Sequence, residues 1–298
     1  MPTAVILLVI LGTVWSLRLS AVKYAFEAGL APHLTIQVSI LGIAAGLTLL
    51  NLIRRTRPPL HGAAVRFYLA SGLLGFICPF SLEAIVAPRL PLFVLVLIVT
   101  TVPIWTLLIA AGTRVERLTG IRLAGVLLGF AAAGLVALDS MSVGGGGIDP
   151  LWCLLALAIP LLYAVYTVFV ASRWPTGVDA VQVAQGQAIA VSIAILAALP
   201  FQPSWAALPL ERGPVTAVAG VVICEIIGLM LYLRLARDRG PTFVAMANYI
   251  AICVGAAVSF AFFGDEVGWP TVLGAVLLVV ALQLARVRPV AGATASSG

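Results

Sequence analysis

Three charged side chains interrupt long apolar stretches of the sequence: Arg18, Glu83 and Glu225. A charge at the centre of a membrane helix costs about 2.5 to 3.5 kcal/mol on insertion scales, so we expect such residues to face a polar cavity or to have a charged or hydrogen-bonding partner. Arg18 and Glu83 lie at matching depths within their stretches. This predicts either an ion pair that lines an outer mouth or two side chains that reach separately to the interface.

Glu225 is the deepest acid in the chain and lies near the middle of its apolar stretch. Two interpretations are open. In the first, its carboxylate faces a cavity, where it takes up a proton in exchange for a solute or binds the ammonium group of a solute. In the second, it is a protonated, hydrogen-bonded side chain that packs between helices.

Aromatic and amide side chains recur in the same stretches, and a wall of this kind suits amphipathic solutes. The candidates for a cavity wall are Trp15, Trp105, Tyr163, Tyr166, Tyr232, Asn248 and Tyr249. Trp and Tyr near the ends of a span are otherwise interface anchors, which is the interpretation for Trp152, Trp174 and Trp269.

Three prolines lie inside apolar stretches: Pro79, Pro103 and Pro160. Each removes one backbone donor, which predicts a kink at which a helix can bend. Pro79 is also a candidate for the cavity wall. Glycines four residues apart, in "GIAAG" from Gly42 and "GVLLG" from Gly125, predict close helix packing within the chain or, alternatively, a contact between two copies in a homodimer.

Other chemistry has little support in the sequence. The two histidines, His33 and His61, fall at helix ends or in a basic loop, and neither an HExxH nor a GxSxG pattern is present. The four cysteines lie singly in apolar runs, without the paired spacing of metal sites. We therefore expect no cofactor, no metal and no enzyme. A channel would need a filter loop or rings of charge, and neither is visible.

Composition indicates what surrounds these residues. Of the 298 residues, 62% are hydrophobic and 9% are charged, and the mean hydropathy is +1.16. Soluble domains are about 25% charged, so this chain has more apolar surface than one soluble core can bury. The sequence predicts an integral membrane protein whose partners are the lipid bilayer and a small-molecule substrate.

Charges, prolines and glycines divide the chain into ten apolar stretches of the length needed to cross a bilayer as helices. We therefore predict an all-α, polytopic fold. The predicted spans are residues 3–22, 33–53, 66–87, 91–112, 121–138, 151–171, 180–199, 215–235, 242–263 and 270–287.

Basic residues set the expected orientation, because loops rich in Arg and Lys stay in the cytoplasm. In this topology the 17 basic residues fall mostly on one side, and only Lys23, Arg89 and Arg212 fall on the other. Both termini should be cytoplasmic, in a bacterial inner membrane. The net charge of +6 is then explained by the basic loops that set the topology and by attraction to anionic lipid, so it implies no nucleic acid partner.

The stretch "SMSVGGGGIDP", residues 140–150, is a flexible linker that divides the chain into two halves of five spans, residues 1–139 and 151–288. Residues 289–298 are expected to form a disordered cytoplasmic tail. No Gly-Lys-Ser/Thr follows the four glycines, so they are not a phosphate loop.

The two halves resemble each other. "RLPLFV" at residues 89–94 returns as "RGPTFV" at 239–244, and at the same offset of 150 Glu116 matches Glu266 and "LAGVLL" matches "LGAVLL". At an offset of 148, Gly29 and Gln37 match Gly177 and Gln185. Because five is odd, the second copy enters the membrane from the opposite side, so Glu116 should be cytoplasmic and Glu266 external.

Segments around these glutamates, "GTRVERLTGIRLAGVLLGFAAAG" and "FFGDEVGWPTVLGAVLLVVAL", together with "VWSLRLSAVKYAFEAG", resemble the EamA-type repeat of the drug/metabolite transporter superfamily. The resemblance covers essentially all ten spans, and within the superfamily the chain is most similar to bacterial amino-acid exporters. It implies secondary transport, with helices one, three, four, six, eight and nine around a central cavity. The chain departs from the usual glycine-serine start of the first helix: it has "TVWSL" at residues 13–17, followed by an unusual Arg18.

Overall fold

The computed structural model describes residues 2–86, 89–90, 95, 98–139, 150–199, 211–263 and 269–284. The regular elements in these ranges are all helical, as the sequence predicts. Among the described residues, six helices are long and apolar enough to cross a membrane, and four more apolar helices are shorter. The predicted tail, and the predicted linker up to residue 149, lie outside the described residues.

In chain order the helices are α1 (Pro2–Glu27), α2 (Pro32–Ile53), α3 (Gly62–Gly72), η1 (Leu73–Ile77), α4 (Cys78–Val86), α6 (Val102–Gly112), α7 (Gly120–Asp139), α8 (Pro150–Ala156), α9 (Ala158–Ser172), α10 (Ala180–Ala198), α11 (Arg212–Arg239), α12 (Pro241–Ala245), α13 (Ala247–Phe263) and α14 (Trp269–Leu284). Several predicted spans are therefore divided. The third is α3, η1 and α4, the sixth is α8 and α9, and the ninth is α12 and α13.

Two of these divisions lie beside prolines. Pro160 has no N–H for the carbonyl of Ala156, the residue at which α8 ends. Pro79 follows the π-helical turn η1, in which backbone hydrogen bonds join residues five apart instead of four apart as in an α-helix. The prediction that Pro103 lies inside a helix is wrong, because this residue lies in the first turn of α6.

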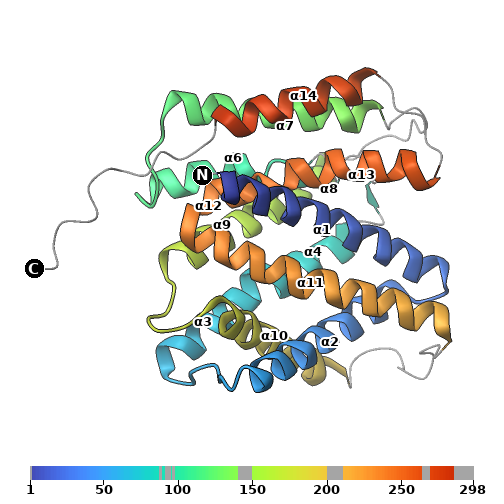
Figure 1. The fold of residues 1–298 in the computed structure, drawn as a ribbon, viewed down its shortest axis with the longest axis vertical. Helices are drawn as coiled ribbons and strands as arrows, with labels where there is room; N and C mark the ends of the chain where they lie inside the picture. Colours follow the sequence, from blue (N-terminus) through green and yellow to red (C-terminus); the bar gives the residue numbers. More distant parts are fainter. Residues whose placement is uncertain are drawn as a thin grey trace, which may run out of the picture.

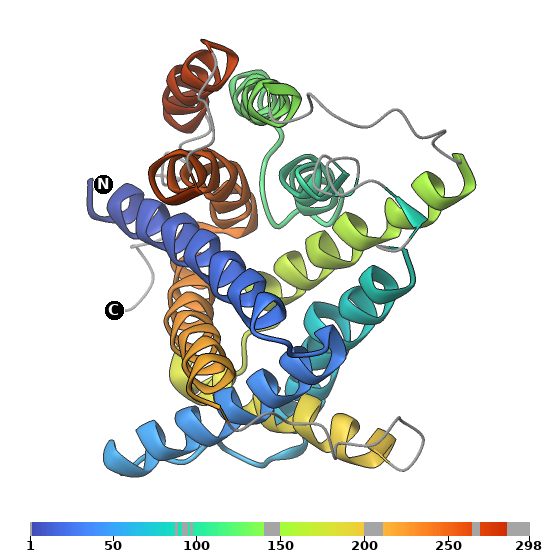
Figure 2. The ribbon, with the colours of Figure 1, turned by 90° about the vertical axis from the view of Figure 1, so that its right-hand side faces the viewer.

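The helices pack in a regular set of pairs. α7 packs against α14, α2 against α10, and α1 against both α11 and α13, while α9 packs against α6, η1 and α4. Figure 1 shows α7 and α14 along one edge of the molecule and α2, α3 and α10 along the opposite edge. In both views α1 and α11 lie side by side (Figure 2). The remaining helices fill the space between the two edges.

Glycines allow the closest helix contacts. Gly42 and Gly46 on α2 lie directly against side chains of α11, and Gly129 on α7 lies under the ring of Tyr249 from α13. A Cβ at any of these positions would come within 3 Å of the neighbouring side chain. In the structure, the glycines of "GIAAG" therefore serve packing within one chain.

One end of the bundle carries an ion pair between α2 and α10. Arg54 donates a hydrogen bond of 2.8 Å to Asp179, which also caps the start of α10 by accepting from the backbone N–H groups of Val181 and Gln182. Burial raises the pKa of Asp179, but these hydrogen bonds outweigh it, so its pKa lies below the ordinary value.

A second polar cluster at the same end joins the two halves of the chain. Glu116, in the loop between α6 and α7, accepts hydrogen bonds from Arg122 on α7 and from the hydroxyl of Thr242 on α12. The side chains of Glu116 and Arg122 are 7% and 9% exposed. Gly240, with φ of +92°, lies so close to Glu116 that a side chain would collide with the carboxylate. We call these four residues the Glu116 cluster.

Similar turns precede α2 and α10. Gly29 has φ of +90° and Gly177 has φ of +73°, in the left-handed region that favours glycine. These are the two glycines matched at an offset of 148 in the sequence. Buried glutamines follow at the second matched pair, Gln37 on α2 and Gln185 on α10.

We expect Gly129→Ala to lower the melting temperature of the protein in detergent, because its methyl group would overlap the buried ring of Tyr249 and overpacking costs about 1 to 3 kcal/mol. Gly134→Ala on the same helix is the matched control, since a Cβ there meets nothing within 4 Å. The control should be neutral or slightly stabilising. Equal melting temperatures for the two variants would contradict the close contact.

Candidate binding cavity

A cavity of about 680 Å³ lies between two groups of helices. One group is formed by α1, α11 and α13, which we call the α11 wall, and the other by η1, α4 and α9, which we call the α9 wall. Ala245 of α12, Val102 of α6 and residues 95, 99 and 100 complete the lining. The volume is within the range of about 300 to 1,000 Å³ that is typical of small-molecule sites.

The cavity brings together most of the candidates from the sequence. Its lining includes Trp15, Arg18, Glu83, Tyr163, Tyr166, Glu225, Tyr232 and Asn248. These residues come from five helices that are far apart in the sequence. All three charges that interrupt the apolar stretches are among them.

Three candidates lie elsewhere. Tyr249 is fully buried between α13 and α7, where its hydroxyl donates to the carbonyl of Val126. It is about 100° around the helix from Asn248, which faces the cavity. Trp105 is half-buried one turn beyond Val102, the residue of α6 that lines the cavity, and Pro79 is buried outside the lining.

Arg18 forms its salt bridge with Glu225, not with Glu83. Nε of Arg18 lies 3.1 Å from Oε1 of Glu225, and the two side chains are 26% and 17% exposed. The atoms are close enough for an ion pair, but this Nε–H lacks the alignment of a hydrogen bond. The expectation of an Arg18–Glu83 pair failed because depth in the membrane does not show which helices are neighbours, and α1 packs against α11.

Glu83 has a neutral partner on its own wall. The hydroxyl of Tyr163 on α9 donates a hydrogen bond of 2.9 Å to Oε1 of Glu83 on α4. Each wall therefore has one carboxyl group beside one polar side chain. The partner is a guanidinium on the α11 wall and a phenol on the α9 wall.

Aromatic rings connect the two walls at the deep end of the cavity. Tyr166 of α9 stacks on Tyr232 of α11, with ring centroids 5.7 Å apart and planes inclined by 5°. Trp15 continues the row 5.9 Å from Tyr232, and Phe76 continues it 6.2 Å from Tyr166. Stacked and edge-to-face rings of this kind form a stiff apolar surface.

Both tyrosine hydroxyls at this deep end are hydrogen bonded. The Tyr232 hydroxyl lies 2.7 Å from Oγ1 of Thr167, and the Tyr166 hydroxyl donates to Oε1 of Gln187 at 3.3 Å. Because both phenols have protein partners, the aromatic rows present mainly their ring faces to the cavity.

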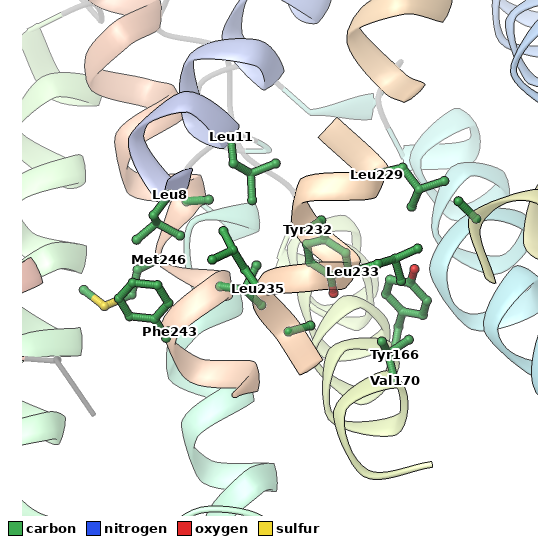
Figure 3. Packing of buried hydrophobic residues seen from close by; sticks show 14 of the residues in the cluster. Leu8, Leu11, Tyr166, Val170, Leu229, Tyr232, Leu233, Leu235, Phe243 and Met246 are labelled. Atoms are coloured by element: carbon green, nitrogen blue, oxygen red, sulfur yellow. The ribbon is translucent and has the colours of Figure 1, made fainter. Parts of the chain in front are cut away.

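Side chains fill the bundle between the deep end of the cavity and the Glu116 cluster. They include Leu8, Leu11, Leu233, Leu235, Phe243 and Met246, each less than 10% exposed. Figure 3 shows Tyr166 and Tyr232 on one side of this packed group and Phe243 and Met246 on the other. The lining extends in the opposite direction as far as Ser20, Glu83 and Gly255.

Sequence reasoning did not single out Phe76, Phe80 and Thr167 as part of the lining. A signal was available for the phenylalanines, since Phe76, Phe80 and Glu83 are spaced by four and three residues and share one helix face. Thr167 follows Tyr166 directly, but nothing in the sequence distinguishes it from the other β-branched residues of α9.

Comparison with known proteins addresses the fold alone. No family model matches the sequence, and no curated protein matches it. A solved structure described as "Crystal structure of protein" is similar, with a TM-score of 0.78 and 18% sequence identity, and the match covers 95% of this chain and 98% of that chain. The arrangement of helices over nearly the whole chain therefore has a counterpart in an experimental structure.

A double-mutant cycle tests the pairing of Arg18. We expect Arg18→Gln and Glu225→Gln to be coupled by about 0.5 to 3 kcal/mol in the free energy of unfolding, as is usual for residues in contact. The cycle of Arg18→Gln with Glu83→Gln should give a smaller coupling. The free energies can be measured by titrating the purified protein in detergent micelles with SDS. A larger coupling to Glu83 would contradict the structure.

Proposed function

We propose that this chain is a secondary transporter of the drug/metabolite transporter superfamily, with ten spans in two inverted EamA-type repeats. It exports amino acids or similar small metabolites across the bacterial inner membrane by alternating access, and both termini are cytoplasmic. The observation that carries the proposal is a cavity of substrate size, lined by both halves of the chain and bordered by packed side chains toward one end of the bundle.

Helix pairing supports two equivalent halves. The first helix of each half packs against the third and fourth spans of the other half: α1 against α11 and α13, and α9 against η1, α4 and α6. The second helices, α2 and α10, pair with each other, and so do the fifth helices, α7 and α14. Exchanging the halves leaves this pattern unchanged, as a pseudo-twofold axis requires.

Contacts between side chains repeat in the same way. The ring of Trp15 on α1 lies against Gly228 on α11, and the ring of Tyr166 on α9 lies against Gly75 on η1. In both cases an aromatic residue of a first helix lies on a glycine of the other half's third span. The left-handed glycines before α2 and α10 are a further repeated feature, and they lie at a sequence match that is independent of the helix pairs.

Charge supports the orientation. The loops at the end that holds the Glu116 cluster carry Arg54, Arg55, Arg57, Arg114, Arg117 and Arg173, and Arg239 ends α11 there. Basic loops remain cytoplasmic, so the packed side chains lie toward the cytoplasm and the cavity extends toward the outside. We therefore assign the structure to an outward-facing state, with the Glu116 cluster as part of the closed inner side.

Counterflow in proteoliposomes tests transport. A panel of labelled amino acids, other metabolites and amphipathic drugs, assayed with and without a pH gradient, should reveal at least one solute that shows saturable counterflow. A solute from the drug group would favour the alternative that the protein exports amphipathic drugs, for which the aromatic rows are the favouring observation. Single-channel currents in a planar bilayer would instead indicate a pore and would contradict the proposal.

The topology has its own test. Accessibility tags placed at Glu116 and at Glu266 should be modified from opposite sides of the membrane, because the two halves are inverted. Labelling of both tags from the same side would contradict inverted repeats whatever the substrate.

The Glu116 cluster gives a test of the closed inner side. We expect Glu116→Gln to shift the population toward the inward-facing state, because hydrogen bonds to a charged group are worth about 1.5 to 3 kcal/mol. The readout is the rate at which an impermeant thiol reagent labels Ala251→Cys from outside, in a background without the four native cysteines. The rate should fall several-fold. Arg234→Gln, which breaks an exposed ion pair with Asp238 within α11 at the same end, is the matched control and should leave the rate unchanged.

A further inference from the structure

The charges in the cavity are distributed unequally between its two walls. On the α11 wall, Glu225 has the guanidinium of Arg18 beside it, and these two charges balance. On the α9 wall, the hydrogen-bond partner of Glu83 among the described residues is the hydroxyl of Tyr163. Both carboxyl groups lie on the third span of their half, Glu225 near the middle of α11 and Glu83 near the end of α4, and each is contacted from the first helix of the other half.

The two carboxyl groups therefore differ in their neighbours: Glu225 has a cation beside it, whereas no cation in the part of the chain that the structure describes lies within salt-bridge distance of Glu83. Arg18 supplies the positive charge beside Glu225, and the neighbour of Glu83 is the neutral phenol of Tyr163. A carboxylate in an apolar surrounding is strongly favoured by a cationic neighbour. A ligand that brings an ammonium group to Glu83 would supply it.

Arg18 in turn can accept an anion. A guanidinium has five N–H donors in a planar fork and binds carboxylates through two parallel hydrogen bonds. The contact with Glu225 is made at Nε without hydrogen-bond alignment, so it does not use this geometry. Glu225 holds the guanidinium at the cavity surface while N–H groups remain for a ligand.

We propose that Arg18 and Glu83 together bind a zwitterion, with the ligand's carboxylate on Arg18 of the α11 wall and its ammonium group on Glu83 of the α9 wall. This inference rests on the proposed function and assigns roles within the same site. Glu225 is a positioning residue for Arg18. The ligand's apolar part lies against the aromatic surface formed by Trp15, Tyr166 and Tyr232.

Such a ligand would connect the two walls. Each of its charged groups contacts a different wall, and these walls must move relative to each other if the cavity is to close on one side and open on the other. A zwitterion therefore stabilises the arrangement in which the walls are close, whereas a ligand with one charged group holds one wall only. The assignment thus links recognition of the ligand to closure of the outer side.

Three ligands of the same shape separate the roles of the two residues. They are phenylalanine, phenethylamine, which lacks the carboxylate, and 3-phenylpropanoate, which lacks the ammonium group. Their affinities for the purified full-length protein can be measured by the concentration dependence of the melting temperature. We expect the wild type to bind phenylalanine at least about tenfold more tightly than either analogue, since each lost charged contact is worth about that factor.

The variants should then show a crossed pattern. Arg18→Gln should bind phenylalanine and phenethylamine about equally, because the carboxylate has lost its partner, and should still discriminate against 3-phenylpropanoate. Glu83→Gln should do the reverse. Glu225→Gln should weaken binding of phenylalanine and 3-phenylpropanoate more than binding of phenethylamine, because Arg18 loses the residue that positions it, and should still discriminate against 3-phenylpropanoate through Glu83. Arg54→Gln, outside the cavity, should match the wild type for all three ligands.

Several results would overturn the assignment. One is a uniform loss of affinity for all three ligands in Arg18→Gln and Glu83→Gln, which is the result expected of purely structural residues. Another is loss of discrimination against 3-phenylpropanoate in Glu225→Gln, which would place the ammonium group there. Absence of preference for phenylalanine in the wild type would also overturn it. None of these results affects the counterflow panel, which tests the proposed function separately.

Discussion

A charge inside an apolar bundle is stable only beside an opposite charge, a hydrogen-bond donor or water, and this constraint explains much of the structure. Arg18, Glu83 and Glu225 all lie on the surface of one cavity, and each has a polar partner on a neighbouring helix. The helices that carry these partners are the ones that pack in pairs, α1 with α11 and α4 with α9. The pairs of helices that pack together are therefore also the ones that place these polar partners on the cavity surface.

The same constraint acts at the end of the bundle. The carboxylate of Glu116 is buried where the loop after α6 meets α12, and it is held by Arg122 and Thr242. Arg122 lies in the same half of the chain as Glu116, so of these two hydrogen bonds it is the one from Thr242 that depends on contact between the halves. This hydrogen bond would break if the two halves separated at this end, as the proposed alternating access requires.

Much of the architecture could be predicted from the sequence. Spacing of apolar residues indicated the long helices, since their length is set by the 1.5 Å rise per residue. Gly29 and Gly177, which were matched only as part of the repeat, have left-handed backbones in two similar turns, so a local signal for these turns was present in the sequence. Divisions within spans were harder to foresee: Pro160 accompanies a break, whereas Pro103 begins a helix. The partner of Arg18 depended on which helices are neighbours, and this information is not local.

In the proposed alternating access, the α11 wall and the α9 wall are apart at the outer end of the cavity and in contact at the inner end in one state, and the reverse in the other state. Distances between pairs of spin labels in nanodiscs test it most directly: Thr113 on the α6 end with Asp238 on the α11 end, and Leu151 on α8 with Glu211 before α11. With a transported solute added, the Thr113 to Asp238 distance should lengthen in part of the population while the Leu151 to Glu211 distance shortens. If both distances change in the same direction, or neither changes with solute, alternating access between these walls is wrong.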